Sequence, residues 1–170
     1  MNKAAVLLII LLIAGGVAVY ADGAMQPMDH SVSRSGVIEA PQLKVFTLIT
    51  DVAHGAEWRP GVKSVTVLQK DKNRDHWVEH LDHGQFMTFI ATRTDPPARR
   101  EVLLDDPRAS YGGTWIYELA PGPSPNTTTL KITETGSIRS PLYRFVMRHV
   151  LGMTHNLDQY MHDIEVAAKK

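Results

Sequence analysis

The chain has 170 residues, enough for one domain with a buried core and an appended segment. Eighteen basic residues balance eighteen acidic ones, so the formal charge is zero and gives no electrostatic basis for binding nucleic acid or an anionic membrane surface. The absence of cysteine excludes disulfides, thiol nucleophiles and cysteine-ligated zinc.

The N-terminal segment is apolar without interruption from Ala4 to Tyr20, with Lys3 before it and Asp22 after it. A run of this length is at the short limit for crossing a bilayer and slightly longer than the core of a signal peptide. Residues 1–21 are therefore either a retained membrane anchor or a cleaved signal segment. Because the single lysine precedes the run, we expect a single-pass anchor with the domain on the extracytoplasmic side. In the cleaved case the domain is secreted or periplasmic.

The domain is expected over residues 31–170, after a short linker at residues 22–30. An alternating segment at residues 31–40 predicts a strand. Pro41 suits the first turn of a helix, where its missing N–H needs no partner. An apolar face at helical spacing then predicts a short amphipathic helix, which a second helical turn follows before Pro60. That face consists of Val45, Leu48, Ile49 and Val52.

The middle of the domain, from Val62 to about Ile138, consists of short extended segments. Six runs of strand-like sequence are separated by turn sequences such as KDKNRD, DHG and APGPSPN. Spacings close to those of hairpins place consecutive strands side by side. The sequence therefore predicts an antiparallel sheet of consecutive strands.

The C-terminal segment carries an apolar stripe at three- and four-residue steps, with no proline after Pro141. This pattern predicts one long amphipathic helix, with Gly152 as a point of bending or close approach. The stripe consists of Leu142, Val146, His149, Met153, Leu157, Tyr160 and Ile164. A helix of this length across a curved sheet leaves room for a cavity between the two layers.

The opening of the domain resembles that of the START-like, or SRPBCC, superfamily, and the resemblance covers roughly residues 31–169. The stretch IEAPQLKVFTLITDVAHGAEWRPGV contains the apolar strand end, the Ala-Pro step, the Val-Phe helix, the aspartate and the Trp-x-Pro corner of that family. The resemblance implies an α+β helix-grip fold, a curved antiparallel sheet wrapped around a long C-terminal helix. In that fold the two short helices plug one end of the sheet, so Trp58 is expected to be architectural. Contact of Trp58 with a ligand stays open.

The expected ligand site is the wall of the cavity between sheet and helix. The sheet would contribute Trp77, Phe89, Trp115 and Tyr117, and the helix Val146, His149, Met153 and Leu157. Aromatic rings and flexible methionines suit an apolar ligand. We therefore expect binding of a lipid-like or other hydrophobic small molecule, with membrane attachment through the N-terminal helix.

Two other functions stay open. A polyketide cyclase/dehydrase-like enzyme would move a proton with His149 or with an inward glutamate, for which Glu79 and Glu134 have the right strand parity. A structural domain would instead fill the cavity with its own side chains. An enzyme needs at least two convergent polar groups. The pattern places at most one inside, so we expect binding rather than catalysis.

Histidines are the remaining candidates for chemistry. His76, His80 and His83 lie close in the sequence, but His76 and His80 would be about 13 Å apart along a strand. A single metal ion cannot bridge that distance. Three polar residues share a helix face that is expected to point to water: His155, Asp158 and His162. We therefore expect no metal and no cofactor.

Overall fold

Seven strands form one sheet in the order β1-β7-β6-β5-β4-β3-β2. The computed structural model describes residues 2–69, 74–82, 84–106, 109 and 111–170. The strands are β1 (Asp29–Ile38), β2 (Val62–Gln69), β3 (His76–Leu81), β4 (Phe86–Asp95), β5 (Arg99–Leu104), β6 (Tyr111–Pro121) and β7 (Thr128–Ile138). Every pairing is antiparallel, and β1 completes the sheet by pairing with β7. The predicted antiparallel sheet is confirmed.

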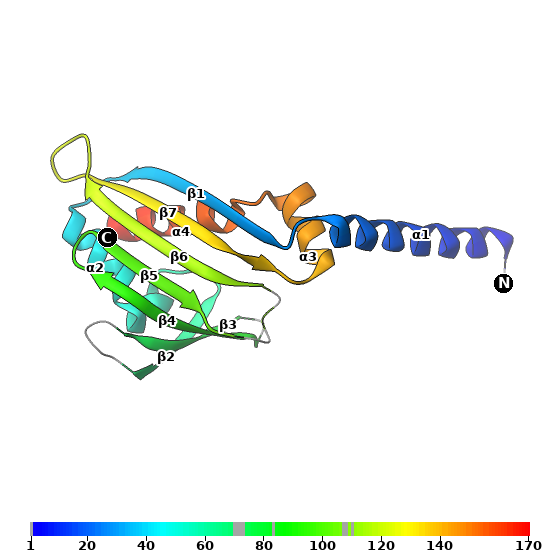
Figure 1. The fold of residues 1–170 in the computed structure, drawn as a ribbon, viewed down its shortest axis with the longest axis horizontal. Coiled ribbons are helices and arrows are strands. Elements are labelled where there is room, and N and C mark those ends of the chain that lie inside the picture. The colour runs from blue at the N-terminus through cyan, green and yellow to red at the C-terminus, as the bar shows by residue number, and fades with distance from the viewer. Residues whose placement is uncertain (1, 70–73, 83, 107–108, 110) are drawn as a thin grey trace.

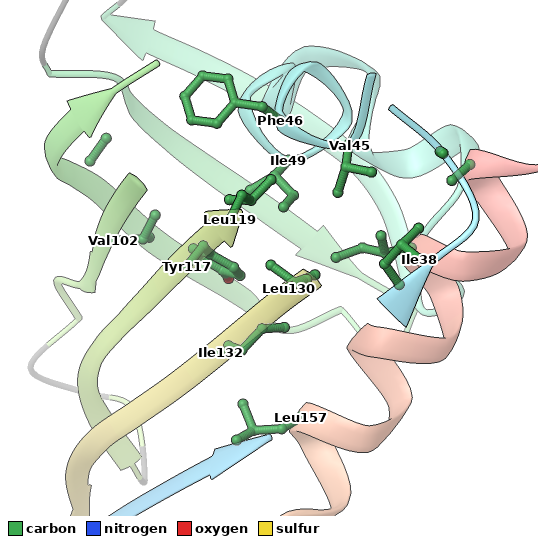
Figure 2. Close-up of a cluster of buried hydrophobic side chains, with 14 of the residues drawn as sticks. Ile38, Val45, Phe46, Ile49, Val102, Tyr117, Leu119, Leu130, Ile132 and Leu157 are labelled. Atoms are coloured by element: carbon green, nitrogen blue, oxygen red, sulfur yellow. The ribbon is translucent and has the colours of Figure 1, made fainter. Parts of the chain in front are cut away.

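The sheet curves around helix α4 (His155–Ala168), so one face of each strand is turned towards the helices (Figure 1). Strand β7 shows this alternation of inner and outer side chains: Leu130 and Ile132 are completely buried, while Lys131 between them is exposed. Side chains from the sheet, α4 and helix α2 (Gln42–Thr50) meet in one core (Figure 2). The α+β architecture expected from the sequence is therefore present.

Two short helices close one end of the curved sheet. Helix α2 starts directly after Pro41 and buries its apolar face in the core. The 3-10 helix η1 (Val52–Glu57) follows, and Gly61, with a φ of 86°, turns the chain into β2. Trp58 packs edge-on against Tyr160 of α4 with ring centroids 5.6 Å apart. The Trp-x-Pro corner is thus part of the architecture, as expected.

The C-terminal segment is not one long helix, and this expectation was wrong. Helix α3 (Pro141–Val146) continues into a π-helical turn, η2 (Met147–Leu151), and the chain breaks at Gly152 before α4 begins. Gly152 has φ 92° and ψ 144°, a conformation that glycine adopts far more readily than other residues. The apolar spacing continues across the break because α3 packs on the N-terminal helix, whereas only α4 packs on the sheet core.

The N-terminal helix α1 (Lys3–Met25) projects from the end of the sheet next to α3 (Figure 1). It is longer than the apolar run predicted, and only Gln26, Pro27 and Met28 separate it from β1. Its apolar window is entirely unburied, and its length and composition suit a membrane span or a signal sequence. At its end Gly23 is buried against α3, where a Cβ atom would collide with the carbonyl oxygen of Pro141.

Candidate ligand cavity

A cavity of about 300 Å³ lies between the curved sheet and the helices. Its wall is rich in aromatic rings, and these come from η1's corner, the sheet, α3 and α4: Trp58, Trp77, Phe89, Tyr111, Trp115, Tyr117, Tyr143 and Tyr160. Trp77 and Phe89 are cross-strand partners in β3 and β4, and their rings stack with centroids 5.5 Å apart. Trp115 meets the edge of Phe89 at 6.4 Å. The sheet register therefore produces a continuous aromatic floor.

Five of the eight residues expected in the cavity wall lie there. These are Trp77, Phe89, Trp115, Tyr117 and Leu157. Met153 lies beside a small crevice that adjoins the cavity rather than in its main wall. Whether any of these residues binds a ligand stays a prediction.

Val146 and His149 lie away from the cavity, so their expected position was wrong. The side chain of His149 is 43% exposed, and its Nε2 atom lies 2.9 Å from the Asp22 carboxylate at the end of α1. The cause is the break at Gly152, which separates α3 and η2 from the helix on the sheet. His149 therefore has a partner in the N-terminal helix and does not face the cavity.

A buried ion pair forms the polar centre of the cavity. Glu79 shares the inner face of β3 with Trp77 and is only 2% exposed. Arg59 donates both terminal nitrogens to Glu79, with Nη2 2.8 Å from Oε2, and the indole nitrogen of Trp77 donates to Oε1 at 3.1 Å. Burial would lower the pKa of Arg59, but Glu79 raises it above its usual range. The guanidinium also lies 5.2 Å from the ring centroid of Tyr160.

Arg100 is a second buried cation in the same wall. It is 1% exposed, pairs with Asp75 at 3.0 Å and lies 5.6 Å from the ring centroid of Trp77. Its Nε atom is buried and has no hydrogen-bond partner within the described part of the chain. A buried donor without a hydrogen-bond partner destabilises the fold, because it has lost its hydrogen bonds to water. The Arg100 guanidinium is therefore incompletely hydrogen-bonded among the described residues.

Three tyrosines keep their hydroxyl protons because they are buried. Burial raises the pKa of Tyr117 well above its ordinary value of 10 and also raises that of Tyr160. Burial raises the pKa of Tyr111 to about 12. At neutral pH these groups are hydroxyls that donate and accept hydrogen bonds, and the phenolate form that would act as a base is not populated.

A second polar cluster lies in the crevice next to the cavity. His30 Nε2 lies 3.0 Å from Glu134 Oε1, and the indole nitrogen of Trp115 donates to Oε2 at 3.2 Å. The other ring nitrogen of His30 is buried without a hydrogen-bond partner in the residues that the structure describes. Tyr111 and Tyr143 line both the crevice and the cavity, so the two spaces are neighbours.

The sequence analysis missed three of these polar residues. Arg100 has the same strand parity as Val102 and Leu104, a signal that would have placed it inside. Arg59 lies in an irregular corner where no periodicity predicts direction. His30 fell in the expected linker, but β1 begins at Asp29 and carries it into the sheet.

Histidines of β3 do not form a cluster in the described residues. His80 hydrogen-bonds Thr66 at 3.2 Å on the neighbouring strand, whereas Nε2 of His76 is buried without a partner among the described residues. His83 lies outside the described residues. Three residues expected to face water, His155, Asp158 and His162, are exposed. No group of potential metal ligands occurs among the residues described, and the absence of a metal stays a prediction.

The sequence model of one protein family, described as polyketide cyclase / dehydrase and lipid transport, matches residues 38–156. The chain belongs to this family. The match spans β1's end to the start of α4 and includes the aromatic floor and both buried arginines. Curated protein sequences show no match. The superfamily resemblance inferred from the domain opening is thereby confirmed.

Solved structures show the same fold as this polyketide cyclase/dehydrase family member. The Zhui aromatase/cyclase from Streptomyces sp. R1128 superimposes with a TM-score of 0.68 at 15% identity, over 83% of this chain and 94% of that one. A START superfamily protein from Mycobacterium smegmatis gives 0.63 at 14% identity, over 82% and 97%. Norcoclaurine synthase from Thalictrum flavum gives 0.65 at 9% identity, over 88% and 91%. The helix-grip fold is confirmed.

Proposed function

We propose that this family member binds a hydrophobic small molecule in the cavity beneath α4. The observation that carries the proposal is the aromatic wall around about 300 Å³ of space. Pockets of this kind are mostly apolar and contain a few placed polar groups that orient the ligand. Lipid transport in the family description and the aromatase/cyclase function of a structural neighbour both support a hydrophobic ligand.

The polar groups of the wall favour a ligand with an oxygen-bearing end. Arg59 and Glu79 balance each other's charge. Tyr117 and Tyr160 add protonated hydroxyls in the same wall. An apolar molecule with a carbonyl or hydroxyl group would pack on Trp77 and Phe89 and direct that group to these hydroxyls.

Filling the cavity tests the proposal. Leu157 is buried on the cavity side of α4, so Leu157→Trp adds bulk where the ligand would lie. We expect the purified full chain to release a small molecule detected by mass spectrometry, and to bind a dansyl-labelled fatty acid saturably. Leu157→Trp should lose both properties, while Leu68→Trp, at an exposed position of β2, should keep them. Unchanged binding by a folded Leu157→Trp variant would place the ligand elsewhere.

A cyclase-like enzyme is the second candidate, and the His30–Glu134 pair favours it. A carboxylate that holds one imidazole nitrogen leaves the other available as a base, if a ligand reaches it. The reaction class would be removal of a proton from a carbon between two carbonyl groups. Deuterium exchange into an apolar β-diketone, followed by NMR, measures that step. Wild type should accelerate exchange and His30→Gln should not, while Leu68→Trp should match wild type.

We also propose that α1 is retained as a single-pass membrane anchor, with the domain on the extracytoplasmic side. Lys3 precedes the apolar run, which supports this orientation. The continuity of α1 supports retention, because the helix runs without interruption from Lys3 to Met25, through the possible cleavage point after residue 21.

A further inference from the structure

Exposed apolar side chains gather on α3 and η2, at the base of α1. Leu142 is 55% exposed, Val150 67% and Leu151 44%, and all three lie within ten residues of one another in the sequence. Large exposed apolar residues elsewhere on the domain are spread one to an element, as with Leu43 on α2 and Leu68 on β2. Single residues of that kind need no explanation, whereas a local group indicates a contact surface.

The position of this surface follows from how α1 is attached. The apolar run from Ala4 to Tyr20 has a helical length of about 26 Å, close to the thickness of a bilayer's hydrocarbon core. Asp22 ends the run, and Gly23, the next residue, is already packed on Pro141 and Phe145 of α3. One residue adds about 1.5 Å along a helix. A bilayer that contains the apolar run therefore has its surface at α3.

Charges near the surface agree with this position. Arg148 is exposed in η2 between α3 and Val150, where it can reach lipid phosphates. The carboxylate of Asp22 at the base of the helix is hydrogen-bonded to His149. Exposed apolar side chains next to a basic one are typical of segments that lie in the interface of a membrane.

We propose that Leu142, Val150 and Leu151 form a membrane-contact surface that seats the domain directly on the lipid bilayer entered by α1. The occupant of this surface is the interfacial layer of the bilayer, continuous with the lipid around α1. The inference rests on the proposed retention of α1 as an anchor. The contact surface goes beyond anchoring, because it holds the domain against the membrane, whereas the anchor alone would leave the domain free to move away from the lipid.

Seating the domain in this way also orients the cavity. Tyr143 belongs to α3 and lines the cavity, and its ring lies 5.8 Å from that of Tyr111. The end of the cavity formed by these two tyrosines is therefore adjacent to the surface in contact with lipid. A hydrophobic ligand would have a short path between the bilayer and the aromatic wall.

The chain contains no cysteine, so single cysteines can report on the contact without further changes. The full chain is reconstituted into phosphatidylcholine vesicles with a nitrobenzoxadiazole dye at Leu142→Cys or Val150→Cys. Leu43→Cys and Leu68→Cys are matched controls, because both positions are exposed on other parts of the domain. Leu8→Cys, exposed on α1, reports on the anchor itself. Nitroxide-labelled lipids quench only dyes that reach the bilayer.

We expect the dyes at 142, 150 and 8 to be quenched by nitroxide lipids and to emit at shorter wavelength than the dyes at 43 and 68. Dyes at 142 and 150 that behave like those at 43 and 68, with the dye at 8 quenched, would overturn the contact surface and leave the anchor intact. An unquenched dye at position 8 would overturn the anchor and the contact surface together.

Discussion

Glu79 illustrates how a single residue acquires a chemical role from strand geometry. Alternation in β3 turns it to the inner face with Trp77, and its carboxylate then requires partners because charge is costly to bury. Arg59 from the corner after η1 and the Trp77 indole supply them. The carboxylate and guanidinium thus hold each other in place in a wall that is rich in aromatic rings.

Removing one member of the Arg59–Glu79 pair should lower the stability of the fold. Glu79→Gln leaves the Arg59 guanidinium in the cavity wall without its counter-charge, and we expect the free energy of unfolding to fall by about 3 kcal/mol. Chemical denaturation followed by tryptophan fluorescence measures the change. Glu118→Gln is the matched control, because Glu118 pairs with Arg99 and Lys131 at the surface. Its loss should be about 0.5 kcal/mol. Equal losses would contradict a structural role for the buried pair.

The buried tyrosines predict a loss of stability in alkaline solution. Burial raises the pKa of Tyr111 to about 12, whereas the unfolded chain has the ordinary value of 10. Below pH 10 both states keep the proton, so the tyrosines make no pH-dependent contribution. As the pH rises from 10 towards 12, the unfolded state loses protons that the folded state retains, and the free energy of unfolding falls.

Chemical denaturation at a series of alkaline pH values checks this prediction. Tyr111→Phe should reduce the slope, because it removes one group with a raised pKa. Absorbance of tyrosinate in the folded protein gives an independent reading. If all tyrosines ionised near pH 10 in the folded state, the predicted burial of their hydroxyls would be refuted.

Alternation along the strands was the only signal in the sequence for which polar residues face the cavity. Glu79 and Glu134 were identified as possible inward residues, and both are buried. Arg100 had the same parity signal but is a type of residue that is normally exposed. Arg59 and His30 depend on a corner and a strand start, where periodicity carries no information. Charged groups that complete the site therefore escaped the sequence analysis.

At the scale of elements, local patterns predicted the helices and strands reliably, but they did not predict which element each helix packs against. The six consecutive strands from β2 to β7 were predicted because hairpin partners are neighbours in the chain. The C-terminal segment kept its helical periodicity through α3, η2 and α4, yet α3 packs mainly on α1, and Leu142 of the predicted stripe is exposed. Periodicity indicates that a face is apolar but not which element covers it.

At Gly152 a side chain would strain the backbone without causing a steric clash. No atom lies within 4 Å of a Cβ placed at position 152, but a side chain there would have to adopt φ 92°. We expect Gly152→Ala to lower the free energy of unfolding by about 1–3 kcal/mol through backbone strain alone. Gly55→Ala is the control, because its Cβ would meet only Val65 at an ordinary 3.7 Å. A harmless Gly152→Ala would show that α3 and α4 can be joined differently.

At the scale of the whole molecule, the N-terminal helix and the domain form one unit in the structure. Besides the Gly23–Arg144 hydrogen bond, a hydrogen bond between Asp22 and His149 links α1 to η2. The sequence could not show this, because the contacts join residues more than a hundred positions apart. Length and hydropathy left the choice between anchor and signal open, and the contacts of Asp22 and Gly23 would remain after cleavage following Ala21.

Retention of α1 gives the prediction that decides how the whole protein is placed. Cleavage after Ala21 would cut within the helix, which continues to Met25, and would leave Asp22 and Gly23 as a free end beside α3. We therefore expect intact-mass analysis to find the chain in the membrane fraction with residues 1–21 still attached. Gly23→Val should keep residues 1–21 and stay in the membrane fraction but lose the docking, because its Cβ collides with Pro141. Limited proteolysis near residues 26–28 would then become faster than in wild type. A mature chain that begins near Asp22 in the soluble fraction would refute the anchor, and the domain would then act as an exported binding protein free of the membrane.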